Sequence, residues 1–196
     1  MAETTYDSST TLIVVDVQND FADPNGSLYV TGGEDVVPVI NGEIEAAAEA
    51  GAKVVYTADF HPKSTPHFAK DGGIWPVHCV GGTWGVEFHP DLKVDGPVVR
   101  KGTRGEDGYS GFSVTDLVTG DISPTGLAAL LAEQGTSKLV VAGLATDYCV
   151  KATVLDGLDA GFPVVLLTDA IRSVDLQKGD GDRSLNEVVA AGGDLV

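Results

Sequence analysis

Short apolar runs alternate with longer amphipathic segments along most of the chain. Five runs rich in Val, Ile and Leu have the composition of buried parallel strands: residues 11–17, 53–58, 97–101, 138–142 and 163–169. Apolar residues recur at helical spacing between these runs, over residues 34–50, 125–135, 151–158 and 183–191. The alternation predicts a three-layer α/β/α sandwich around a mainly parallel sheet of five to six strands, in which residues 192–196 add a short edge strand.

The length of the chain suits a single domain. Its 196 residues are enough for a complete core, and hydrophobic and charged fractions of 43% and 21% are usual for globular proteins. Because the chain has no internal repeat, low-complexity block or linker, we expect residues 1–196 to form one domain, with residues 1–9 as a flexible tail.

The charge balance excludes several classes of partner. The formal net charge is −17, whereas nucleic acids and anionic membrane surfaces require a basic patch. No apolar run reaches membrane-spanning length, and the first ten residues lack the basic region of a signal peptide. We therefore expect a cytoplasmic protein that binds neither nucleic acid nor membrane, with Cys79 and Cys149 both reduced.

Cys149 follows the point where a predicted strand gives way to a predicted helix. At such a position, free backbone N–H groups and the positive end of the helix dipole favour the thiolate, which is the nucleophilic form. Thr146 and Asp147 are good candidates to cap this helix. Most intracellular cysteines are structural, however, so the position of Cys149 does not by itself identify a catalytic residue.

Two other ionisable residues, Asp16 and Lys101, lie at the ends of predicted strands. Open parallel sheets bind ligands at the carboxyl ends of their strands. An aspartate next to an apolar strand is costly to bury unless it has a partner, although most lysines are simply solvated. Together with Cys149, these residues would bring an acid/base, a cation and a nucleophile to one crevice, as nucleophilic catalysis requires.

Three of the four histidines lie close to a strand-terminal aspartate. Asp59 and His61 point the same way if this segment is extended, so they can ligate one ion. His67 and His78 follow within the next loops, whereas His89 is separated by a Gly-rich segment and is left out. A set of imidazoles with a carboxylate favours one divalent transition metal ion, such as Zn, Fe or Mn.

Aromatic residues occur among these polar segments. Phe21 and Trp75 lie in polar or Gly/Pro-rich stretches, where aromatic side chains suit either the core or the walls of a site for a planar ligand. The Gly-rich residues 102–111 lack the spacing of a Walker motif, so they indicate no phosphate site.

Five segments together resemble nicotinamidases of the isochorismatase-like hydrolase family. They are residues 15–21 (VDVQNDF), 59–62 (DFHP), 75–79 (WPVHC), 101–102 (KG) and 143–150 (GLATDYCV). The similarity runs from about residue 11 to the C-terminus. The first and last segments indicate the superfamily, whereas the Asp-His-His set and the WPVHC segment indicate nicotinamidase, because many relatives lack that metal site.

The resemblance implies an amidohydrolase that converts nicotinamide to nicotinic acid and ammonia, with pyrazinamide as a further candidate substrate. Cys149 would attack the carboxamide and form a thioester, Asp16 would carry the proton, and Lys101 would orient Asp16. A cis peptide bond before Ala145 is also implied, with the backbone N–H groups of Ala145 and Cys149 as the oxyanion hole.

The resemblance also implies which residues bind the metal ion and which contact the pyridine ring of the substrate. Zn²⁺, Fe²⁺ or Mn²⁺ would bind Asp59, His61, His67 and His78. The ion would ligate the pyridine nitrogen or position the deacylating water. Phe21 and Trp75 would sandwich the ring, with Tyr109 nearby. Two departures are Val77, where relatives often have proline, and the position of His67, which varies among relatives.

Two alternatives remain open. The chain could be another amidase of the superfamily, acting on N-carbamoyl or ureido substrates without the four-residue metal set, or a non-catalytic small-molecule binder. A thiol oxidoreductase is disfavoured because the sequence has no Cys-x-x-Cys motif. Both a monomer and a homo-oligomer are compatible with the sequence.

Overall fold

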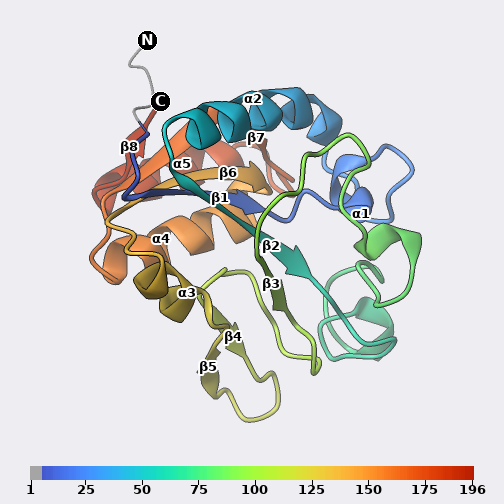
Figure 1. The fold of residues 1–196 in the computed structure, drawn as a ribbon. Helices are drawn as coiled ribbons and strands as arrows, with labels where there is room; N and C mark the ends of the chain where they lie inside the picture. The colour runs from blue at the N-terminus through green and yellow to red at the C-terminus, as the bar shows by residue number, and fades with distance from the viewer. Residues whose placement is uncertain (1–5) are drawn as a thin grey trace.

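A six-stranded sheet lies between two layers of helices in the computed structural model, which describes residues 6–196 (Figure 1). The strands follow the order β3-β2-β1-β6-β7-β8, and every neighbouring pair is parallel. Their bounds are β1 Thr10–Val15, β2 Lys53–Asp59, β3 Val98–Lys101, β6 Lys138–Leu144, β7 Val164–Arg172 and β8 Asp194–Leu195. The predicted α/β/α sandwich is therefore confirmed, including the short edge strand.

The four predicted helices are present. They are α2 Val36–Glu49, α3 Leu127–Glu133, α4 Lys151–Asp159 and α5 Asp180–Ala190, and a short helix α1 spans Asn19–Ala22. Short 3₁₀ turns occupy Gly33–Asp35, Ala69–Asp71 and Trp84–Val86. In Figure 1, α2 covers one face of the sheet, whereas α3 and α4 lie on the opposite face.

The central strand β1 contributes side chains to both halves of the core. Leu12 and Val14 pack in one cluster with residues of α2, whereas Ile13 and Val15 pack in a second cluster with residues of α3, α4 and α5. Successive side chains of a strand point to opposite faces, so a strand covered on both sides is apolar throughout. For this reason residues 11–17 are almost continuously apolar and do not alternate between apolar and polar residues.

The strand ends meet at one edge of the sheet because all the strands run in the same direction. Asp16 follows β1 directly, β2 ends at Asp59, β3 ends at Lys101 and β6 ends at Leu144. In the ladder between β2 and β3, Asp59 is the direct partner of Lys101. The fold therefore places the predicted acid, metal ligand and cation next to one another.

Several segments differ from the prediction. A small antiparallel hairpin of β4 Ser113–Thr115 and β5 Ile122–Pro124 was not expected. Strand β7 continues to Arg172, beyond residue 169, and its pairing with β6 shifts register between Val141 and Gly143. These features depend on strand contacts rather than on local composition.

The described part of the N-terminal segment contacts the rest of the fold. Residues 1–5, which belong to the expected flexible tail, lie outside the described residues. Tyr6 contrasts with that expectation, because its hydroxyl donates a hydrogen bond of 2.7 Å to Glu43 on α2. Within residues 6–196, no helix is long and apolar enough to cross a membrane.

Candidate active site

Asp16 is the buried acid of the site. Its backbone leaves β1 with a φ of 50°, in the left-handed region, and turns the carboxylate into the crevice. The Thr57 hydroxyl donates to Oδ1 at 2.6 Å, and the Lys101 ammonium donates to Oδ2 at 2.6 Å. Burial, opposed by Lys101 and reinforced by the charge of Asp59, raises the pKa of the Asp16 carboxyl.

Lys101 is completely buried and its ammonium group is fully engaged. Besides the bond to Asp16, Nζ donates to the carbonyls of Gly108 at 2.7 Å and Tyr109 at 3.2 Å, and it lies 3.0 Å from Asp59 Oδ1. Burial disfavours its charge, but the neighbouring carboxylates Asp16 and Asp59 outweigh burial and raise the pKa of Lys101 well above its usual value. Unlike most lysines, which are solvated, Lys101 is a buried cation of the site.

Cys149 lies beside these groups. It belongs to a π-helical turn, Thr146–Val150, which joins β6 to α4. The carboxylates of Asp16 and Asp59 and the Cys149 sulfur have atoms that all lie within 4.8 Å of one another. The geometry thus brings the three predicted catalytic residues together, with Asp16 positioned to receive the thiol proton.

The surroundings of Cys149 oppose the activation expected from a helix terminus. Burial raises the pKa of the Cys149 thiol well above its usual value; Lys101 lowers it, whereas the charges of Asp16 and Asp59 raise it further. The resting cysteine is therefore a thiol, and its deprotonation depends on a base.

The predicted capping by Thr146 and Asp147 is wrong. Neither side chain caps the turn or the following helix. The Asp147 carboxylate instead accepts hydrogen bonds of 2.9 Å from the backbone N–H groups of Val174 and Asp175. It ties the turn that carries Cys149 to the segment after β7.

The peptide bond between Leu144 and Ala145 is cis, as the resemblance implies. The Ala145 carbonyl accepts hydrogen bonds from the N–H groups of Tyr148 and Val150, both at 3.1 Å, which close the turn. Ala145 and Cys149 both line the pocket described below. The two residues assigned to the oxyanion hole therefore line the same pocket.

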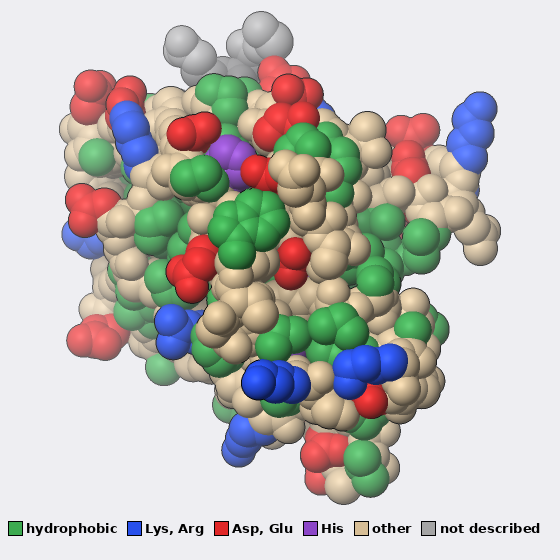
Figure 2. All heavy atoms as spheres, turned by 90° about the vertical axis from the view of Figure 1, so that its right-hand side faces the viewer, with side chains coloured by type: hydrophobic (Ala, Val, Ile, Leu, Met, Phe, Trp, Pro, Cys, Tyr) green, Lys and Arg blue, Asp and Glu red, His purple; other side chains and the backbone are tan. Residues whose placement is uncertain are grey.

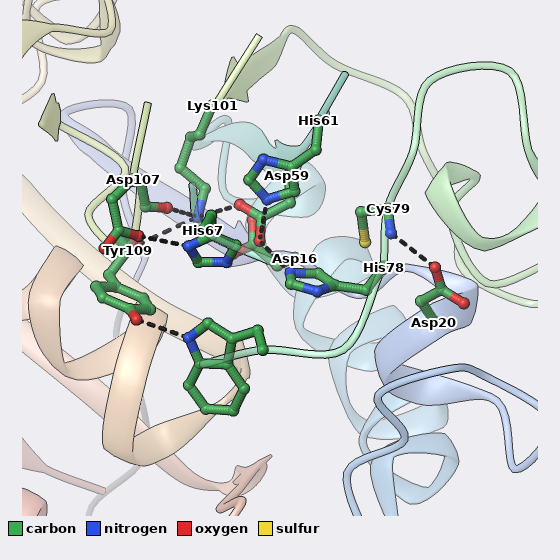
Figure 3. A network of polar contacts seen from close by, with 12 residues as sticks. Asp16, Asp20, Asp59, His61, His67, His78, Cys79, Lys101, Asp107 and Tyr109 are labelled. Carbon is green, nitrogen blue, oxygen red and sulfur yellow. Dashed lines mark hydrogen bonds and ion pairs between the residues drawn. The ribbon is translucent and has the colours of Figure 1, made fainter. Parts of the chain in front are cut away.

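The predicted metal ligands form one buried cluster (Figure 3). Ring nitrogens of His61, His67 and His78 lie within 4.8 Å of one another. Asp59 Oδ2 lies 3.7 Å from His61 Nε2 and 3.8 Å from His78 Nε2. All three rings are buried. Figure 2 shows a patch of histidine surface, bordered by acidic and apolar side chains, on the face that it draws.

The chemistry of this cluster fits a transition metal ion. Both ring nitrogens of His61 are buried and have no hydrogen-bond partner among residues 6–196, an arrangement that is costly without a ligand. The Pro76 carbonyl contacts His78 Nδ1 at 2.7 Å, which leaves Nε2 directed at Asp59. Three imidazoles and a carboxylate are the donor set of zinc and related ions.

Electrostatics keep two of these residues, Asp59 and His78, in their metal-binding forms. Burial lowers the pKa of His78 to about 4, so its ring is neutral near pH 7. Although burial opposes its charge, Asp59 has a pKa well below the usual range because Lys101, His61 and His78 favour the carboxylate. Neutral imidazole and ionised carboxylate are the forms that ligate metals.

Gln18 is a contributor that the sequence analysis missed. Its buried amide accepts a hydrogen bond from the Asp59 N–H and donates to the Asp59 carbonyl, both at 2.8 Å. The same amide nitrogen donates to the Val86 carbonyl at 2.8 Å. Gln18 therefore fixes the backbone of Asp59 from both sides. Gln18 lies within the VDVQNDF segment that carries the family resemblance, but the sequence analysis assigned it no role.

A pocket of about 390 Å³, including its open mouth, lies against the cysteine and the histidine cluster. Phe21, Trp75 and Tyr109 all line it, and the Trp75 indole donates a 2.8 Å hydrogen bond to the Tyr109 hydroxyl. Phe21 lies on α1 rather than in a loop. The sequence analysis missed five other lining residues: Leu28, Val30, Leu144, Tyr148 and Val174.

Tyr148 completes the aromatic wall of this pocket. Its ring lies edge-on to Trp75 with centroids 4.8 Å apart, and 5.6 Å from the ring of Tyr109. The residue directly precedes Cys149, so the turn that presents the nucleophile also presents this ring. An apolar pocket with a few convergent polar groups is the usual form of a small-molecule site.

Comparisons with known proteins agree with this geometry. The chain is 36% identical to the nicotinamidase of Escherichia coli (strain K12), over 94% of this chain and 92% of that protein. The crystal structure of Pyrococcus horikoshii pyrazinamidase in complex with zinc superposes with a TM-score of 0.84 at 38% identity, covering 96% and 98% of the two chains. PnC1 from L. infantum in complex with nicotinate gives a TM-score of 0.87 at 36% identity, covering 98% and 95%.

The family model described as the isochorismatase domain matches residues 10–196, which is nearly all of the chain. The match covers every residue of the cysteine site, the histidine cluster and the aromatic pocket. The protein belongs to the isochorismatase family.

Proposed function

We propose that this protein is a nicotinamidase, which hydrolyses nicotinamide to nicotinic acid and ammonia. The observation that carries the proposal is that one aromatic pocket is lined by Cys149, Asp59, His67 and His78 together. A nucleophile and a metal-binding cluster therefore face the same small ligand. The names of the relatives and the nicotinate complex of a similar structure support the same substrate class.

Cys149 acts as the nucleophile in this mechanism. Its sulfur attacks the carboxamide carbon while Asp16 accepts the thiol proton, and Lys101 stabilises the charge left on the site. The raised pKa of Asp16 suits a group that first accepts and then returns a proton. Collapse of the tetrahedral intermediate breaks the C–N bond, and Asp16 returns the proton so that ammonia leaves and a thioester remains.

The second half of the reaction removes the acyl group. Water attacks the thioester carbon as Asp16 accepts one of its protons. The carbon–sulfur bond then breaks as Asp16 returns that proton to the Cys149 sulfur, which releases nicotinic acid and restores the thiol. In both halves the negative oxygen would accept hydrogen bonds from the backbone N–H groups of Ala145 and Cys149.

One divalent ion, Zn²⁺, Fe²⁺ or Mn²⁺, would be held by Asp59, His61, His67 and His78. When bound, such an ion supplies Lewis acidity to a pyridine nitrogen or to a water ligand. The protein's own part is to keep these four side chains buried, with Asp59, His67 and His78 lining the pocket. Phe21, Trp75 and Tyr109 would hold the flat ring of nicotinamide or pyrazinamide.

The main rival is an amidase of the same family that acts on open-chain N-carbamoyl or ureido substrates. Such substrates carry no aromatic ring, so they leave both the aromatic wall and the histidine cluster without a role. A cytoplasmic location, a monomeric or homo-oligomeric state, and the single-domain organisation of residues 1–196 stay predictions.

The test is ammonia release by the purified protein from nicotinamide, pyrazinamide and an N-carbamoyl amino acid. Each assay uses protein stripped of metal and protein reloaded with Zn²⁺, Fe²⁺ or Mn²⁺. Metal-dependent release from nicotinamide supports the proposal. Release from the N-carbamoyl substrate alone would favour the rival, and tight nicotinamide binding without ammonia would favour a non-catalytic binder.

A further inference from the structure

Asp107 contacts the histidine cluster from outside and has no part in the mechanism above. Its Oδ1 atom lies 3.1 Å from His67 Nδ1 (Figure 3). That oxygen is buried and makes no completed hydrogen bond among residues 6–196, so its contact with His67 is an ion-pair contact by distance. The His67 side chain is 5% exposed, whereas that of Asp107 is 22% exposed, so the pair is largely removed from solvent.

The backbone holds Asp107 firmly in this position. Its N–H donates to the Thr115 carbonyl at 2.8 Å, and the Thr115 N–H donates back to the Asp107 carbonyl at 2.7 Å. The next two carbonyls, of Gly108 and Tyr109, accept hydrogen bonds from Lys101. The segment from Asp107 to Tyr109 thus contacts the metal cluster, the buried cation and the aromatic pocket in turn.

The ring of His67 packs against the other two histidines and turns its Nδ1 toward Asp107. Its ring stacks on His61, with centroids 4.8 Å apart and an interplanar angle of 22°, and its centroid lies 5.2 Å from that of His78. His78 is already oriented by the Pro76 carbonyl. With Nδ1 of His67 facing Asp107, Nε2 is the nitrogen left to bind an ion.

The geometry points to Asp107 as a positioning residue of the metal site. The Asp107 carboxylate accepts the Nδ1 proton of His67, which fixes the tautomer and the ring orientation and leaves the Nε2 lone pair for the ion. Carboxylates that hold metal-binding histidines in this way strengthen binding about 10- to 100-fold. The inference rests on the metal site of the proposed function, but it concerns metal affinity and not turnover.

The test is Zn²⁺ binding to metal-stripped protein, measured by competition with a chromophoric chelator. Asp107→Asn keeps the shape and the backbone bonds but removes the acceptor charge, and we expect affinity to fall about 10- to 100-fold. Glu106→Gln is the matched control, because this neighbouring carboxylate contacts Arg104 and not His67. The control should change affinity less than about twofold, and thermal unfolding should show both variants folded.

A double-mutant cycle separates positioning from a general effect on the loop. In a His67→Ala background, Asp107→Asn should have almost no further effect on Zn²⁺ affinity, because Asp107 acts through His67. If His67→Ala abolishes measurable Zn²⁺ binding, the visible absorption of the Co²⁺-loaded protein decides instead. It should change in Asp107→Asn and stay unchanged in Glu106→Gln.

Three results would overturn the inference: unchanged Zn²⁺ affinity in Asp107→Asn, a full additional loss in the His67→Ala background, or a Co²⁺ spectrum that Asp107→Asn leaves unaltered. A wild-type protein that binds no Zn²⁺ would overturn the metal site itself. Wild-type binding without an Asp107 effect would overturn only the role of Asp107.

Discussion

Asp59 and Lys101 connect the metal cluster with the catalytic residues. Asp59 Oδ1 lies 3.0 Å from Lys101 Nζ, while Oδ2 lies 3.7 Å from His61 and 3.8 Å from His78. The two residues face each other as direct partners in the β2–β3 ladder. One carboxylate therefore serves both the ligand set and the cation that contacts Asp16.

Asp59→Asn should consequently cost more than the loss of the metal alone. Both Asp59→Asn and His61→Ala are expected to lose the ion, but only Asp59→Asn also weakens the contact with Lys101. Residual nicotinamide turnover, measured in metal-stripped proteins, should be lower in Asp59→Asn than in His61→Ala by about tenfold, as expected when a charge-assisted contact is lost. Equal residual rates would show that Asp59 acts only as a ligand.

The two cysteines should behave differently. Cys149→Ala is expected to reduce nicotinamide turnover roughly 10⁴-fold or more with little change in stability, because it removes the nucleophile. Cys79 is buried too, but its backbone N–H donates to Asp20 and its sulfur contacts the Gly85 carbonyl. Cys79→Ala should therefore cost about 1–2 kcal/mol of unfolding free energy and leave turnover largely intact.

Initial rates and thermal unfolding of both cysteine variants check this prediction. Substantial turnover by Cys149→Ala would contradict the role of Cys149. A folded Cys79→Ala protein without activity would show that Cys79 is required for turnover.

Asp16→Asn should separate thiol reactivity from turnover. The Asp16 charge raises the pKa of the Cys149 thiol, so removing that charge should shift the pH midpoint of iodoacetamide alkylation downward. Turnover should nevertheless fall roughly 10⁴-fold, because the proton acceptor is gone. Alkylation rates of the two proteins across pH 6–11 provide the measurement. If Asp16→Asn does not shift the pH dependence of alkylation, the side chains of Asp16 and Cys149 do not interact.

The sheet was predictable because its signal is local. A strand buried on both faces must be apolar along its length, so β1 and β6 stand out without knowledge of their neighbours. The direction of the strands then places Asp16, Asp59 and Lys101 at one edge. For these residues, sequence order and fold topology suffice to predict proximity.

Other features depend on contacts that the sequence pattern does not encode. Asp147 looks like a helix cap but accepts hydrogen bonds from the segment after β7, and Asp107 meets His67 across a separation of 40 residues. Tyr148 reaches the pocket from a turn that is π-helical, a form that the sequence pattern does not distinguish from an α-helix. Such partnerships arise from the packing of distant segments.

Trp75 and Tyr109 should stabilise the pocket as a pair. Tyr109→Phe leaves the buried indole N–H without its acceptor and should lower the free energy of unfolding by about 1–3 kcal/mol. Trp75→Phe in addition to Tyr109→Phe should cost less than the sum of the two single changes, because the unpaired donor is removed as well. Chemical denaturation of the three variants measures this coupling. Strict additivity would mean that the hydrogen bond contributes nothing.

His78 should make the metal-free protein sensitive to mild acid. Burial lowers its pKa from 6.5 to about 4 in the folded state, whereas the unfolded chain titrates near 6.5. Between these values the unfolded chain binds a proton that the folded protein does not, so the free energy of unfolding falls as the pH falls. The contribution of His78 to this loss should be on the order of 3 kcal/mol by pH 4.

The comparison with His78→Gln isolates this contribution from that of the carboxylates, because glutamine occupies a similar volume and does not titrate. Denaturation of metal-stripped protein at several pH values should show wild type losing stability relative to His78→Gln between pH 6.5 and pH 4, with no relative change above pH 7. A constant difference across the whole range would mean that the folded protein accepts the proton on His78 as readily as the unfolded chain. Burial would then not hold the ring in its neutral, metal-binding form, and the ion would have to displace a proton from His78 at mildly acidic pH.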